Sequence, residues 1–172
     1  MDLELLKYPI GKFEQGVQYT SADTRSHIKV LEKFPQRLKA LTAKLSDNQL
    51  DTPYRPDGWT LRQVVHHLAD SHINMFTRIR LALTEENPTV KGYDEAAWAL
   101  LPDHQLPIKS SLQIIEGLHK RMVFLFKTLD KKAMRKTFFH GGYQKSYEIK
   151  SVIALYAWHS EHHYQHIFRT IQ

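Results

Sequence analysis

Residues 58–72 read GWTLRQVVHHLADSH and carry a complete start signal for a long amphipathic helix. Thr60 and Gln63 stand three positions apart, as in a capping box, where each side chain bonds the backbone N–H of the other residue. Apolar residues then recur every three or four positions, which places them on one helical face. They are Leu61, Val64, Val65, Leu68, Met75, Ile79 and Ala82. The stretch therefore predicts a helix over about 60–83 with one buried face.

The same periodicity recurs in three other segments and predicts helices over about 21–45, 110–129 and 148–171. We expect Ser21 or Asp23 to cap the first of these helices and Pro35 to kink it. The segments between helices are expected to be connections, with one turn of helix within 1–20 and a short helix at 94–101. These connections cover 1–20, 46–58, 87–108 and 130–147. Four long helices predict an all-α four-helix bundle, and the long connections leave room for a topology other than simple up-and-down.

Composition narrows the class of protein. A chain of 172 residues is expected to form one domain over 1–172. It has no cysteine, so a disulfide framework and a thiolate metal site are excluded. No run of 18 apolar residues is present and the N-terminus lacks a signal-peptide pattern, so we expect a cytoplasmic protein with no membrane span. The net charge of +6 is spread along the chain, and we expect no nucleic-acid partner.

Histidine is the unusual component, with eleven residues gathered mainly in two places. The segment 158–166 reads WHSEHHYQH and holds two pairs at i, i+4 spacing, His159 with His163 and His162 with His166. Such a pair lies on one helical face and can chelate one ion. The apolar stripe of this helix continues through His159 and His163, so this pair is expected to face the core. His162 is expected beside the stripe, with Glu161 and Gln165, and His166 is borderline.

A third ligand has to come from another helix, and 60–83 offers His66, His67 and His72. His67 lies at the rim of the apolar face, and facing helices of a bundle commonly build metal sites from inward side chains. The sequence thus predicts a site of His67, His159 and His163. The alternative is that these are hydrogen-bonded core histidines or surface histidines that share the spacing by chance. Two separate clusters on two amphipathic helices favour the metal site.

The segments 55–72 and 158–166 together resemble the YfiT-like branch of the DinB family. The resemblance implies a four-helix bundle of unusual connectivity and a metal held by three histidines, which correspond to His67, His159 and His163. Glu161 stands where relatives carry a histidine, outside the ligand positions. The resemblance also implies a homodimer. For activity it implies a metal-dependent hydrolase, or a thiol S-transferase that joins bacillithiol or a similar small thiol to an electrophile.

Three nitrogen ligands leave one coordination position open, which is typical of catalytic rather than structural metal sites. We expect one divalent ion per chain, zinc or nickel, since imidazole suits both. Water bound there can act as a hydroxide nucleophile and hydrolyse a small-molecule substrate. A low-molecular-weight thiol bound there would become a thiolate and give S-transfer. No general base is obvious in the motifs, so a non-catalytic metal-binding module remains a third alternative.

Polar residues follow His67 along the same predicted helix. Asn74 and Arg78 stand seven and eleven positions further on, so they share its face and could orient a substrate carboxylate or phosphate. The alternative is a polar stripe that faces solvent. Asp70 could accept a hydrogen bond from the ring nitrogen of a metal-ligating imidazole that faces away from the metal, or it could pair with a nearby arginine.

Overall fold

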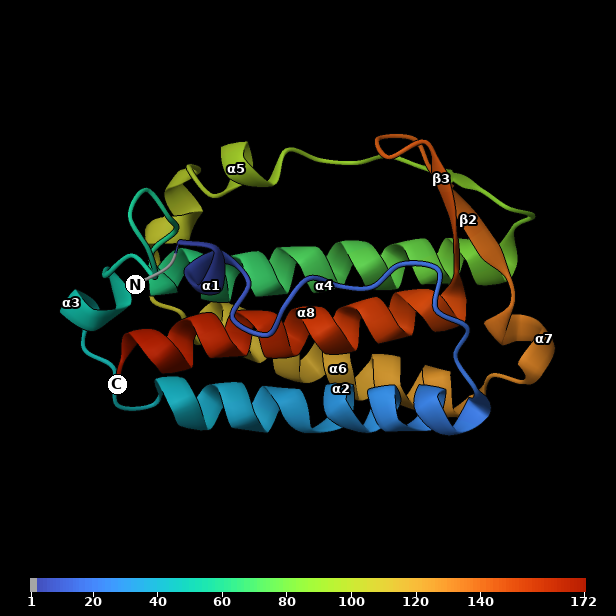
Figure 1. Ribbon diagram of the computed structural model, residues 1–172, viewed down its shortest axis with the longest axis horizontal. Helices are drawn as coiled ribbons and strands as arrows, with labels where there is room; N and C mark the ends of the chain where they lie inside the picture. The colour runs from blue at the N-terminus through green and yellow to red at the C-terminus, as the bar shows by residue number, and fades with distance from the viewer. Residues whose placement is uncertain (1–2) are drawn as a thin grey trace.

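The computed structural model describes residues 3–172 and is built on four long helices that lie side by side (Figure 1). They are α2 (Ser21–Thr42), α4 (Leu61–Thr84), α6 (Lys109–Thr128) and α8 (Ile149–Thr170). The four-helix bundle predicted from the sequence is therefore confirmed. The short elements are α1 (Leu3–Lys7), α3 (Asp47–Leu50), α5 (Glu95–Trp98), the 3₁₀ helix η1 (Pro102–Gln105) and α7 (Lys131–Met134). Within the described residues, no helix is long and apolar enough to cross a membrane.

The order of the helices around the bundle is not simple up-and-down. Both α2 and α4 pack against α6 and α8. The first two long helices of the chain, α2 and α4, therefore lie at opposite corners of the bundle. The connection 85–108 runs back along α4 before α6 begins (Figure 1). Arg62, near the start of α4, donates a hydrogen bond to the carbonyl oxygen of Leu106 at 3.4 Å, which fixes the end of that connection. As a result α6 starts beside the start of α4 and runs parallel to it.

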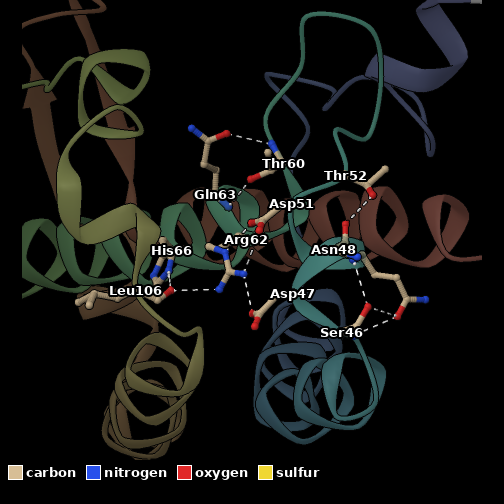
Figure 2. A network of polar contacts seen from close by, with 11 residues as sticks. Ser46, Asp47, Asn48, Asp51, Thr52, Thr60, Arg62, Gln63, His66 and Leu106 are labelled. Carbon is tan, nitrogen blue, oxygen red and sulfur yellow. Dashed lines mark hydrogen bonds and ion pairs between the residues drawn. The ribbon is translucent and has the colours of Figure 1, made fainter.

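Arg62 also anchors α3 to the bundle (Figure 2). Its Nε donates to Asp51 at 2.7 Å, and its Nη2 donates to Asp47 at the same distance. Both carboxylates raise the pKa of this buried guanidinium, which therefore stays charged. The start of α4, which leads to the first histidine cluster, is thus held on two sides.

Local signals placed most helix ends within a few residues. Thr60 and Gln63 form the expected capping box at the start of α4. The cap of α2 is Thr20 rather than Ser21 or Asp23, because Asp23 sits at the third helical position and accepts a hydrogen bond from the backbone N–H of Thr20 at 2.8 Å. This helix continues through Pro35 and ends at Thr42, short of the expected 45. The arm expected over 1–20 contains α1, and its residues 1 and 2 lie outside the described part.

The connections expected over 46–58 and 130–147 contain more regular structure than the sequence analysis allowed. The first includes α3, and the second includes α7 and a hairpin of β2 (Thr137–His140) and β3 (Lys145–Glu148). Strand β1 (Thr89–Val90) pairs with β2 in parallel, and β2 pairs with β3 antiparallel with Thr137 opposite Glu148. The alternate burial along β2 and the Gly141–Gly142 turn are typical of a hairpin, whereas the sequence analysis interpreted 130–147 as a connection. The hairpin stands over the far half of α4 (Figure 1).

The core consists of two apolar clusters separated by histidines. One cluster contains Met75 of α4, Met122 of α6 and Ile153 of α8. The other contains Leu68 of α4, Ile115 of α6 and Ile167 of α8. His72 of α4, His119 of α6 and His159 of α8 lie between the two clusters, and the first two are fully buried. A polar layer therefore crosses the middle of the bundle.

Candidate metal centre

The structure brings His67 of α4 together with His159 and His163 of α8. Each offers one ring nitrogen, and the three nitrogens lie within 4.8 Å of one another. The Nε2 atoms of His67 and His159 are 3.2 Å apart. His67 and His163 are buried and His159 is half-buried, so the three rings converge in a largely water-free position. Three imidazoles placed in this way could hold one small cation.

All three rings are neutral at pH 7. Burial lowers the pKa of His67 to about 4, and repulsion from a neighbouring imidazole contributes. Burial, with repulsion from the other rings of the group, also lowers the pKa values of His159 and His163 well below the ordinary range. A neutral imidazole keeps a lone pair on one nitrogen, and this is the form that binds a divalent metal. The donor set therefore fits the ion that the sequence predicts.

A second group, His162, His163 and His166, also has nitrogens within 4.8 Å of one another. The Nε2 of His166 is already used, since it donates to the carbonyl oxygen of Lys7 at 3.2 Å. The sequence analysis placed His162 beside the buried stripe, but the structure buries it, so that expectation was wrong. The N-terminal arm covers this side of α8, with the ring of Tyr8 at 6.1 Å from that of His162.

A cavity of about 300 Å³ opens beside the three histidines. The hairpin supplies one wall, and its contributions are Phe138, His140, Tyr143 and Tyr147. Two charged residues, Arg78 and Glu95, also line it. Sequence reasoning missed Glu95 and the hairpin residues because they reach the cavity only through the folding of two connections over α4. A larger hollow of about 960 Å³ lies between the start of α2 and α7 and holds none of the clustered histidines.

The structure places the three polar residues predicted near His67 in different surroundings. Arg78 lines the cavity, and its Nη2 donates to the carbonyl oxygen of Lys91 at 3.0 Å. Asn74 donates to the backbone carbonyl of Asp70 at 2.9 Å and is not among the described residues that line the cavity. The carboxylate of Asp70 accepts a hydrogen bond from His104 Nε2 at 3.0 Å. Asp70 therefore does hold an imidazole, but one outside the three-histidine group.

Glu95 is the residue of the cavity lining that carries a carboxylate. Burial of its carboxyl group raises its pKa, although much of the residue remains exposed, and the positive charge of Arg78 opposes that shift. A carboxylate with a raised pKa is better suited to accept a proton from water near neutral pH than an ordinary one. The cavity thus brings together three histidines that could hold a cation, a guanidinium and a carboxylate.

Comparison with known proteins identifies the family of the chain. The family model of the DinB superfamily matches residues 31–167. A candidate metal-dependent hydrolase of Oceanobacillus iheyensis is 48% identical over 161 residues, covering 94% of this chain and 93% of the relative. One of Bacillus cereus is 46% identical over 162 residues, with the same coverage. The solved structure of YfiT from Bacillus subtilis is described as a probable metal-dependent hydrolase with an unusual four-helix bundle topology. It matches this chain with a TM-score of 0.94 and 41% sequence identity, and the match covers 96% of this chain and 95% of YfiT. The chain belongs to the DinB superfamily, as a YfiT-like member.

Proposed function

We propose that this protein is a metal-dependent hydrolase whose single divalent ion is held by His67, His159 and His163. The observation that carries the proposal is the convergence of three neutral imidazoles at a cavity large enough for a small molecule. The names of the relatives, candidate metal-dependent hydrolases, support it. Zinc and nickel are the proposed ions, since both accept imidazole ligands. When bound with one position open, such an ion supplies a Lewis acid that makes water a competent nucleophile near pH 7.

The chain's own residues supply the rest of the chemistry. The guanidinium of Arg78 can hold a carboxylate or phosphate of the substrate by paired hydrogen bonds. The carboxylate of Glu95, which lines the same cavity, would accept a proton from water there. Phe138, Tyr143 and Tyr147 form an aromatic wall on one side of the cavity.

The test is a screen of the zinc- and nickel-loaded protein against small esters and amides that carry a carboxylate. Hydrolysis without added thiol supports the proposal. A second arm adds bacillithiol, cysteine or glutathione together with a chloro-dinitroaromatic electrophile. Because the chain has no cysteine, consumption of the thiol in step with the electrophile would assign the activity to S-transfer instead. Activity that persists in the His67→Ala, His159→Ala double variant would refute a role of the ion in either reaction. A fully metallated protein that is inactive in both arms would favour a non-catalytic metal-binding module.

Arg78→Met is expected to raise KM for a carboxylate-bearing substrate by roughly tenfold to a hundredfold, because a charge-assisted hydrogen bond contributes about 1.5–3 kcal/mol. The KM for a neutral ester of the same size should change little. Steady-state kinetics on the two substrates measure the difference. Asn74→Ala is the matched control, since Asn74 lies one turn away on α4 and outside the cavity lining. Equal effects of Arg78→Met on both substrates would show that Arg78 does not bind the anionic group.

A further inference from the structure

A chain of imidazoles crosses the bundle from the candidate metal centre to the opposite helix. His159 Nδ1 of α8 lies 3.4 Å from His72 Nε2 of α4. His72 Nδ1 lies 2.8 Å from His119 Nε2 of α6, and His119 Nδ1 lies 2.7 Å from the carbonyl oxygen of Leu31 in α2. The chain occupies the layer between the two apolar clusters, and all four long helices take part in it. Neither α2 nor α6 contributes a residue to the three-histidine group.

The carbonyl at the end of this chain determines where every proton lies. A carbonyl oxygen can only accept, so His119 must carry its proton on Nδ1 and present a lone pair on Nε2. His72 must then donate from Nδ1 to His119, which leaves a lone pair on its Nε2. His159 must in turn donate from Nδ1 to His72. The remaining lone pair of His159 is therefore on Nε2, the atom that lies 3.2 Å from His67 Nε2.

A second, shorter chain acts on the other histidine of α8 in the same way. His166 Nε2 lies 3.2 Å from the carbonyl oxygen of Lys7, so it must donate, and its Nδ1 must accept. His163 Nδ1 lies 3.3 Å from this Nδ1 of His166. His163 therefore carries its proton on Nδ1 and also presents its Nε2 lone pair. Two independent chains, each ending on a backbone carbonyl, thus give the two histidines the same tautomer.

We propose that His72, His119 and His166 are positioning residues of the metal centre, which fix His159 and His163 as Nδ1–H tautomers that present Nε2 to the ion. The inference rests on the proposed function for the identity of the site. Hydrogen bonds to the far nitrogen of a ligating histidine fix its orientation and raise its basicity, and their loss commonly costs about tenfold to a hundredfold in metal affinity. His119 acts through His72 and contacts no member of the group, so its effect would reach the ion only along the chain.

The first test reads the tautomers directly in the metal-free protein. Nitrogen-15 NMR of ring-labelled histidine at pH 7 separates protonated from unprotonated ring nitrogens. We expect Nδ1 protonated and Nε2 unprotonated in His72, His119, His159 and His163, and the reverse in His166. Protonated Nε2 in His159 and His163 would overturn the proposal. If the wild type bound no zinc, the proposed function would be wrong. The tautomers would still show whether the two imidazole chains fix His159 and His163 as proposed.

The second test interrupts the imidazole chain at His119, which lies away from the ion. His119→Gln keeps an acceptor for His72 and a donor for Leu31, whereas His119→Leu removes both. Competition with a chromophoric chelator should show zinc affinity close to wild type for the glutamine variant and about tenfold to a hundredfold weaker for the leucine variant. Equal zinc affinity of the two variants would overturn the proposal. If the leucine variant does not fold by circular dichroism, the pair His166→Gln and His166→Leu applies the same comparison to the shorter chain.

Discussion

His163→Ala is expected to lose stable metal binding and with it all metal-dependent activity. Zinc sites with four ligands bind with about 10–16 kcal/mol, so one ligand accounts for about 3 kcal/mol and its loss weakens binding by about a hundredfold or more. The two histidines left, His67 and His159, lie on different helices and cannot hold the ion as an i, i+4 pair. Elemental analysis after dialysis and calorimetric zinc titration measure the change.

Two further variants separate the candidate group from the second histidine group. His67→Ala should weaken zinc binding to a similar extent, since His67 belongs only to the first group. His162→Ala is the matched control, because His162 is buried next to His163 in the chain and belongs only to the second group. It should keep the zinc affinity of the wild type. The reverse pattern, with loss in His162→Ala and retention in His67→Ala, would move the ion to the second group.

Acid is expected to unfold the metal-free protein between about pH 6.5 and 4. Burial lowers the pKa of His119 to about 4, from an ordinary value of 6.5. In this interval the unfolded chain binds a proton at His119 and the folded protein does not, so falling pH favours unfolding. The shift corresponds to about 3 kcal/mol of stability that is fully present above pH 6.5 and is lost as the pH falls toward 4. His67, whose pKa is lowered to about 4 by the same cause, adds a comparable loss.

The losses at His119 and His67 together approach the free energy of unfolding of an ordinary domain, about 5–15 kcal/mol. Urea unfolding followed by circular dichroism at several pH values measures the free energy of unfolding. His119→Gln is the control, since glutamine does not titrate, and its stability should fall by about 3 kcal/mol less over the same interval. A free energy of unfolding that stays constant from pH 7 to pH 5 in the wild type would contradict the prediction.

Much of the fold follows from short-range patterns in the chain. The Thr60–Gln63 capping box and the apolar residues after it predicted where α4 begins and which face it buries. Helix ends shifted where a competing cap was available, as at Thr20. The hairpin at 137–148 escaped prediction because its strands are only four residues long and acquire their stability by pairing with each other and with β1. The order of the helices around the bundle depended on the path of 85–108, which local patterns do not encode.

The sequence by itself determined the face of α8 that carries His159 and His163, because the helical period sets which side chains share a side. It also determined that the protein supplies no thiolate ligand, since the chain has no cysteine. Only the tertiary structure decided the uses of the three histidines of α4. His66 turns to Ser111 at 2.7 Å, His72 turns to His119, and His67 meets α8. These roles depend on which helix packs against each side of α4. Packing between segments 40 to 92 residues apart is decided by contacts that no local pattern records.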